Sequence, residues 1–144
     1  TIADSDPRVT VLSFARNFGH QLALTAGMDY ANGEVVVTMD SDLQHPPMII
    51  HEMIAQYEAG YDVVYAVRAD YQKLSFFKKQ TAKIYYGLLK RVANIEVIPG
   101  AADFRLMSRP AILAIRSMRE KHRYLRGMAP WVGVGWVSYD YGEI

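Results

Sequence analysis

The chain of 144 residues contains no cysteine, so disulfide bonds and thiolate metal sites are excluded. It has no apolar run close to the ~18 residues that a membrane-spanning helix requires. Its start also lacks the charged and then apolar stretch of a secretory signal. From these absences we expect the chain itself to be soluble or peripheral to a membrane.

Charge is nearly balanced overall, with a net value of +1, but it is unevenly distributed. Residues 1–67 carry two basic and nine acidic side chains, whereas residues 68–126 carry fourteen basic and four acidic ones. An acidic half can hold a divalent cation, and a basic half can face phosphates or an anionic membrane. Taken alone, this distribution favours two ordinary solvated faces.

The first half of the chain alternates apolar runs with segments of helical spacing. Apolar and β-branched runs predict three strands, at residues 9–14, 34–39 and 61–67. Helical spacing predicts a helix over residues 21–32 and a second one that opens at Pro46-Pro47 and ends at Gly60. The alternation predicts right-handed crossovers and a parallel α/β sheet.

The pattern changes after residue 68. In order along the chain we expect a helix, an extended segment, a second helix and a last strand, at residues 74–92, 103–107, 109–118 and 132–139. Lysines and aromatic residues in the segment 74–92 suit a helix that lies on a membrane. A helix packed on the core with a solvated basic face fits the same spacing, so both interpretations stay open.

Two aspartates spaced one residue apart, Asp40 and Asp42, follow the apolar run at residues 34–39. In open α/β sheets, ligands bind beyond the carboxyl ends of the strands. Carboxylates are hard oxygen ligands, suited to Mg²⁺ or Mn²⁺ that bridges a diphosphate. The spacing alone leaves a capping or solvated loop equally open, because Asp4 and Asp6 repeat it in a segment that we interpret as a solvated loop.

Several longer motifs carry a family resemblance. They are Ala15-Arg-Asn-Phe-Gly-His-Gln21, Ala26-Gly-Met-Asp-Tyr-Ala31, Met39-Asp-Ser-Asp-Leu-Gln-His-Pro-Pro47, Gly100-Ala-Ala-Asp-Phe-Arg-Leu-Met-Ser-Arg109 and Arg123-Tyr-Leu-Arg-Gly127. Together they resemble the family-two glycosyltransferases of the GT-A fold, above all those that transfer sugars to polyprenyl phosphates. The resemblance covers most of the chain. It implies a Rossmann-like α/β fold, a three-layer α/β/α arrangement with a mostly parallel sheet.

The resemblance assigns donor-side roles within the acidic loop. It implies that Asp40 and Asp42 hold the metal and the donor diphosphate, with Asp42 also counted as catalytic. It places Gln44 near the donor sugar. On this reading residues 1–67 form the part of the domain that binds the donor and the metal.

Acceptor-side roles fall in residues 68–144. By the same resemblance Asp103 lies near the acceptor as a catalytic residue, either orienting it or taking a proton. A helix cap or an ion pair with Arg105 is the structural alternative for Asp103, and both stay open. Arg105 is expected to contact phosphate, and Arg123 and Arg126 to clamp phosphate at the mouth of the site, a task suited to the guanidinium fork.

The chain departs from the family pattern at both ends. The first two strands of the family, with their nucleotide-binding motifs, are absent, and so are its C-terminal membrane helices. We therefore expect residues 1–144 to be a single glycosyltransferase domain fragment, incomplete at the N-terminus. A sheet edge exposed in this way invites self-association, which makes a homo-oligomer possible.

The function implied is an inverting, metal-dependent transfer of a hexose from a nucleotide diphosphate sugar to a polyprenyl phosphate. UDP-glucose is the first expected donor and GDP-mannose the second. For the full-length protein we expect the cytoplasmic face of a membrane. The alternatives are a non-catalytic fragment that acts in assembly and a basic nucleic-acid module. Nucleic acid is not an expected partner, because residues 116–126 offer one aromatic side chain, Tyr124, for stacking.

Overall fold

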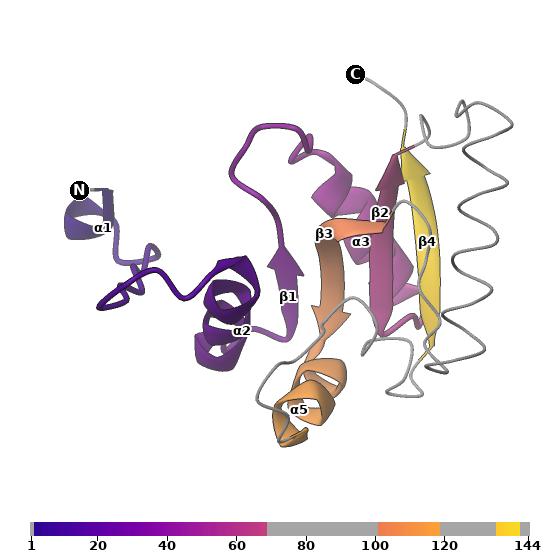
Figure 1. The fold of residues 1–144 in the computed structure, drawn as a ribbon. Coiled ribbons are helices and arrows are strands. Elements are labelled where there is room, and N and C mark those ends of the chain that lie inside the picture. The colour runs from indigo at the N-terminus through magenta and orange to yellow at the C-terminus, as the bar shows by residue number, and fades with distance from the viewer. Residues whose placement is uncertain (1, 69–100, 119–134, 142–144) are drawn as a thin grey trace, which may run out of the picture.

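The computed structural model describes residues 2–68, 101–118 and 135–141 (Figure 1). The helices are α1 (Ile2–Ser5), α2 (His20–Tyr30), α3 (Ile49–Glu58) and α5 (Arg109–Ser117). The strands are β1 (Val35–Thr38), β2 (Val63–Arg68), β3 (Ala101–Ser108) and β4 (Trp136–Tyr141). The predicted helix at 74–92 and the basic residues Arg123 and Arg126 lie outside the described residues.

The four strands form one sheet in the order β1-β3-β2-β4. Strand β3 is antiparallel to both β1 and β2, whereas β4 is parallel to β2. Strands β1, β2 and β4 therefore share a direction, and β3 runs against them between β1 and β2. Among the described residues the sheet is mixed, with two antiparallel pairings and one parallel pairing, where the sequence predicted a mostly parallel one. Because of this reversal, the beginning of β3 lies at the edge where β1 and β2 end: Thr38 pairs with Arg105, and Val67 pairs with Ala101.

Side chains alternate between the two faces of the sheet, as the period of a strand requires. One face packs against α2 and α5 through the buried residues Met28, Val63, Tyr65, Val67, Met107, Ala111, Ile112 and Ile115. The opposite face packs against α3 through Ile49, Met53, Val64, Ala66, Phe104, Leu106 and Tyr141. Helices thus cover both faces, and the expected three-layer α/β/α arrangement is confirmed.

Two arginines of α5 fix helix α2 by its C-terminal end. Arg116 Nη2 donates to the carbonyl oxygens of Met28 at 2.5 Å and of Ala31 at 2.8 Å, and Arg109 Nη1 also donates to Ala31 at 2.8 Å. The last carbonyls of a helix have no partner within the helix and carry a partial negative charge. Guanidinium groups therefore satisfy and stabilise this end, and they hold α2 so that its first residue, His20, faces the sheet edge.

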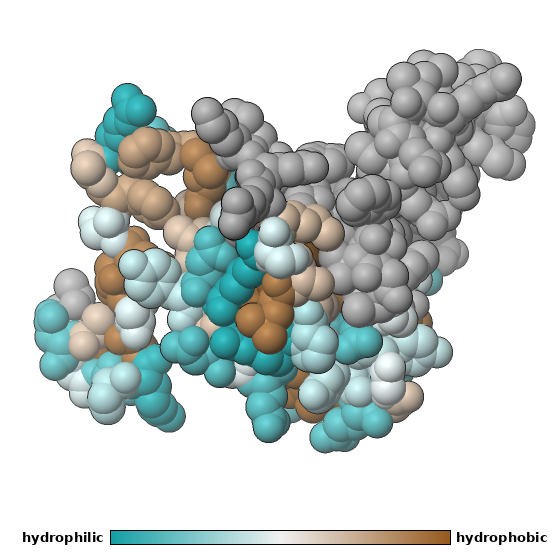
Figure 2. Space-filling view, turned by 90° about the horizontal axis from the view of Figure 1, so that it is seen from below, coloured by the Kyte–Doolittle hydropathy of each residue, from teal (hydrophilic) through white to brown (hydrophobic). Residues whose placement is uncertain are grey.

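The chain before α2 differs from the prediction. Residues 9–14 form no strand, and Val11, Leu12 and Phe14 are exposed there. The apolar surface at the left of Figure 2, where the chain before α2 lies, reflects this exposure. The prediction of a strand was wrong because β-propensity needs a partner strand, and no strand in the described part of the chain pairs with residues 9–14.

The short helix α1 lies in the segment interpreted as a solvated loop, whereas the remaining elements match the prediction within a few residues. Helix α3 begins at Ile49 rather than at the two prolines, since a turn in which Pro46 accepts from Ile49 N–H comes first. Gly60, with φ of +103°, follows its end as expected. Within the three described ranges, no helix has both the length and the hydropathy to cross a membrane.

Candidate active site

The acidic loop, residues 40–45, leaves the carboxyl end of β1. Asp40 is half-buried and Asp42 is exposed. Asp42 Oδ1 accepts the backbone N–H of Gln44 at 3.0 Å, and Leu43 between them has a φ of +61°. Asp42 thus closes a turn within the loop and caps no helix, since the N-cap of α3 is Met48 and has no side-chain cap hydrogen bond. It uses one carboxylate oxygen to fix the turn, and a carboxylate has a second oxygen with which to bind a ligand.

A buried ion pair lies on β3 beside this loop. Arg105 Nη2 donates to Asp103 Oδ1 at 2.7 Å, and both side chains are 1% exposed. The ion pair predicted as the structural alternative for Asp103 is thus present. Charges removed from water in this way are held only where a partner of good geometry compensates the loss of hydration.

Neighbouring strands enclose the ion pair on both sides. Thr38 of β1 and Tyr65 of β2 are the cross-strand partners of Arg105. Thr38 Oγ1 donates to the backbone carbonyl of Asp103 at 2.5 Å. Burial raises the pKa of the Tyr65 hydroxyl to about 12, although the nearby Arg105 charge and hydrogen bond pull it down. The phenol therefore stays neutral beside the guanidinium.

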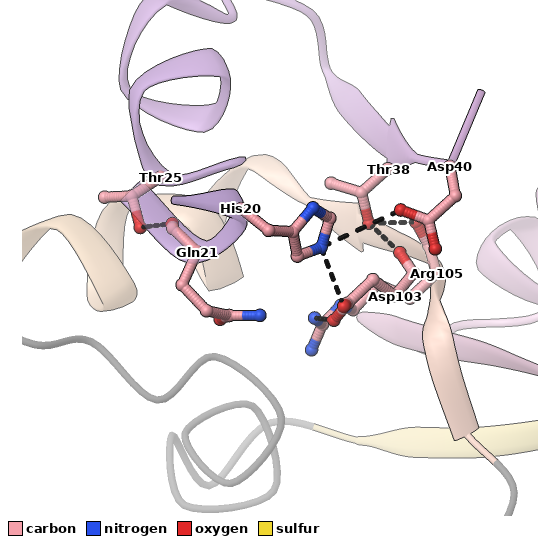
Figure 3. A network of polar contacts seen from close by, with 7 residues as sticks. All are labelled: His20, Gln21, Thr25, Thr38, Asp40, Asp103 and Arg105. Carbon is pink, nitrogen blue, oxygen red and sulfur yellow. Dashed lines mark hydrogen bonds and ion pairs between the residues drawn. The ribbon is translucent and has the colours of Figure 1, made fainter. Parts of the chain in front are cut away.

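His20 connects the ion pair to the acidic loop (Figure 3). Its Nε2 shares a hydrogen bond of 3.0 Å with Asp103 Oδ2 and lies 3.7 Å from Asp40 Oδ1. The structure thus brings Asp40, Asp103 and Arg105 together around a histidine for which the sequence predicted no role. A contact between residues 83 positions apart leaves no local sequence pattern. The one sequence feature that could have indicated a role for His20 was its position in the motif of residues 15–21.

His45 closes the acidic loop from the other face of the sheet. It is buried, it shares a hydrogen bond of 2.7 Å between Nδ1 and the Tyr141 hydroxyl, and its ring centroid lies 5.1 Å from that of Phe104. These contacts give His45 a packing role that anchors the loop to the end of β4.

The chemistry of the acidic loop suits a cation shared with a ligand. The described ranges contain no group of three His, Cys, Asp or Glu side chains able to hold a metal, so an all-protein cage is not formed there. Mg²⁺ is usually bound through one or two carboxylates, with substrate phosphates and water as its other ligands. Asp40 and Asp42 fit that arrangement, and Gln44 is exposed in the same loop.

Comparison with known proteins gives the family. A family model described as glycosyl transferase family 2 matches residues 1–116. The chain is 47% identical over 136 residues to a Bacillus subtilis protein named uncharacterized glycosyltransferase YkcC, covering 94% of this chain and 42% of that protein.

Two further relatives have more specific names. Identity is 40% over 132 residues to the prophage bactoprenol glucosyl transferase homolog of Escherichia coli, covering 92% of this chain and 43% of that protein. It is 39% over 132 residues, with the same coverage, to the bactoprenol glucosyl transferase of Shigella phage SfV. The chain therefore spans less than half the length of these relatives.

Proposed function

Because this chain belongs to glycosyl transferase family 2, we propose that it forms the catalytic part of an enzyme that transfers a hexose to a polyprenyl phosphate. The donor is a nucleotide diphosphate sugar. UDP-glucose is the preferred candidate and GDP-mannose the second. The phage SfV relative is named a bactoprenol glucosyl transferase and the Escherichia coli relative a homolog of one, and these names support the acceptor and the glucose.

The observation that carries this proposal is the position of the acidic loop. Asp40 and Asp42 follow β1 at the sheet edge where ligands of α/β folds bind. Asp40 also lies beside the His20, Asp103 and Arg105 network. Asp40 and Asp42 are the residues we propose to hold Mg²⁺ or Mn²⁺ with the donor diphosphate. The bound cation supplies neutralisation of the charge that grows on the leaving diphosphate.

The acceptor chemistry needs little from the protein beyond orientation. An oxygen of the polyprenyl phosphate attacks the anomeric carbon opposite the leaving diphosphate, so the configuration at that carbon inverts. With a second pKa near 6, a phosphate monoester already carries the required negative charge at neutral pH. A strong general base is therefore unnecessary, and burial of Asp103 at 1% exposure favours an orienting role over proton removal.

Two parts of the proposal concern residues or surroundings outside the described structure. Arg123 and Arg126 are proposed to clamp phosphate at the mouth of the site, where bidentate guanidinium contacts bind phosphate well. The acceptor is a lipid, so we propose that the full-length protein works at a membrane surface, on its cytoplasmic face. Self-association of the chain stays a prediction.

Nucleotide binding tests the proposal. Calorimetric titrations with UDP, GDP, UDP-glucose and GDP-mannose are made in Mn²⁺ and again in EDTA. We expect one nucleotide and its sugar to bind in Mn²⁺ only, and we expect Asp42→Asn to abolish that binding. Asp4→Asn is the matched control, since it removes an aspartate of the same spacing far from the loop. Binding that is unchanged by Asp42→Asn or by EDTA would contradict the metal site.

A further inference from the structure

Exposure divides the network of Figure 3 into an inner and an outer part. Arg105 and Asp103 are 1% exposed, whereas the His20 side chain is 53% exposed. A ligand that arrives from solvent therefore meets His20 before it meets the buried ion pair. Asp103, predicted from the resemblance to act on the acceptor itself, lies behind the histidine.

The contacts of His20 fix which ring nitrogen is left for a ligand. Both Asp103 Oδ2 and Asp40 Oδ1 lie on the Nε2 side, at 3.0 and 3.7 Å. An ionised carboxylate is an acceptor only, so Nε2 carries the hydrogen and Nδ1 is the ring nitrogen left for a ligand. Figure 3 shows Nδ1 turned away from both carboxylates. A ligand hydroxyl is the kind of group that pairs with such a nitrogen, since it can both donate and accept a hydrogen bond.

A turn at Gly19 delivers the ring to this position. Gly19 has φ of 88° and ψ of 162°, a region that only glycine occupies without strain. Its backbone N–H is held by Asn17 Oδ1 at 2.8 Å. No atom lies within 4 Å of the position of an added Cβ at Gly19, so this glycine serves the backbone conformation rather than close packing. Helix α2 begins at the next residue, His20.

We infer that His20 is a substrate-contacting residue of the proposed transferase site and that Asp103 acts by positioning its ring. The ligand group is a hydroxyl of the bound donor, because the ring lies beside Asp40, the carboxylate proposed to hold the donor diphosphate. This inference rests on the proposed function. It adds His20 to Asp40 and Asp42 as a residue that contacts the donor. It also changes the role of Asp103 from contact with the acceptor to positioning of the His20 ring.

Two replacements of His20 separate contact with substrate from support of Asp103. His20→Ala removes the ring and both of its nitrogens. His20→Gln keeps an amide N–H able to donate to Asp103 but has no polar atom at the place of Nδ1. We expect both variants of the full-length enzyme to lose roughly 10- to 100-fold in kcat/KM, the effect of losing a hydrogen bond to a reacting ligand. His51→Ala is the control, since His51 is exposed on α3.

Recovery by glutamine decides against the inference. If the kcat/KM of His20→Gln lies within about threefold of the wild-type value while that of His20→Ala does not, the ring only supports Asp103. Activity of both variants near the wild-type value overturns it as well. Unfolding midpoints close to that of the wild type, expected for a half-exposed residue, show that the loss does not come from misfolding.

A double-mutant cycle tests the positioning role of Asp103. In the His20→Ala background, we expect Asp103→Asn to lower kcat/KM by less than about threefold more, with kinetics measured well below each unfolding midpoint. If the loss of kcat/KM in the double variant equals the product of the losses in the two single variants, the positioning role is overturned. Absence of transfer by the wild-type enzyme from any of the donors is a separate result. It refutes the proposed function, and the inference with it, before any variant is compared.

Discussion

Two ion pairs in this chain have the same spacing and the same length but opposite surroundings. Asp6 and Arg8 are two residues apart and 2.7 Å from each other, as are Asp103 and Arg105. The Arg8 and Asp6 side chains are 88% and 27% exposed, whereas both members of the second pair are 1% exposed. Distance and sequence spacing therefore do not distinguish the two pairs.

Hydration is what separates them. Charges at the surface keep most of their water and are screened by salt, so their attraction adds little to stability. Charges in the core have lost their water, and each depends on its partner for compensation. The buried pair also reaches His20, 83 residues away in the chain, through Asp103 Oδ2. We conclude that the buried pair organises the site and that the surface pair is local.

The largest effect is expected from breaking the buried pair. Arg105→Met leaves the Asp103 carboxylate buried without its cation. We expect the free energy of unfolding to fall by about 3–5 kcal/mol, measured by urea denaturation at pH 7. A loss below about 1 kcal/mol would show that Asp103 is not held as a buried charge.

A double replacement sharpens this prediction. Asp103→Asn together with Arg105→Met removes both charges, so neither is left uncompensated. The double variant should be more stable than Arg105→Met alone. If Arg105→Met does not fold at all, folding of the double variant would still show that the uncompensated Asp103 charge causes the loss of stability.

A smaller effect is expected at the phenol beside the ion pair. Burial raises the folded-state pKa of Tyr65 to about 12 from 10.0. A raised folded pKa contributes stability that is complete below pH 10 and is lost as the pH rises to 12, by on the order of 3 kcal/mol. Between pH 9 and 12 the free energy of unfolding should therefore fall less steeply with pH for Tyr65→Phe than for the wild type. Equal slopes would contradict the burial of this hydroxyl.

The smallest effect is expected at the surface pair. Its hydrogen bonds to Arg8 hold the pKa of Asp6 below its usual value of 3.8. Arg8→Met should let that pKa return upward, which an NMR titration of the Asp6 carboxyl measures. We expect urea unfolding at physiological salt to stay unchanged, since the exposed Arg8 guanidinium keeps its water and salt screens its attraction to Asp6. A destabilisation as large as that of Arg105→Met would remove the contrast between the two pairs.

The sequence predicted those elements whose signal is local. Strands β1, β2, β3 and β4 and helices α2, α3 and α5 lie close to the expected positions, because apolar periodicity and turn residues set them. The position of β3 between β1 and β2 was not predicted, since strand pairing is decided by contacts far apart in the sequence. At residues 9–14 the sequence predicted a strand that is not formed, because a strong local propensity has no partner strand there.

The site shows the same division between local and distant signals. Asp40, Asp42, Gln44, Asp103 and Arg105 were found through motifs of the family, and the structure joins three of them in one network. His20 was missed because its partners Asp40 and Asp103 are distant in the chain and its spacing matches no metal motif. The roles of all these residues in catalysis stay predictions, as do those of Arg123 and Arg126.

The most direct test of the account is sugar transfer by the full-length enzyme, with radiolabelled UDP-glucose and GDP-mannose as donors and polyprenyl phosphate in Mg²⁺ or Mn²⁺. We predict labelled lipid from one donor, and a loss of turnover on the order of 10²–10³ in Asp42→Asn with none in Asp4→Asn. Wild-type transfer that Asp42→Asn leaves intact would contradict the acidic loop as the catalytic centre, and no labelled lipid from any donor would contradict the transferase itself.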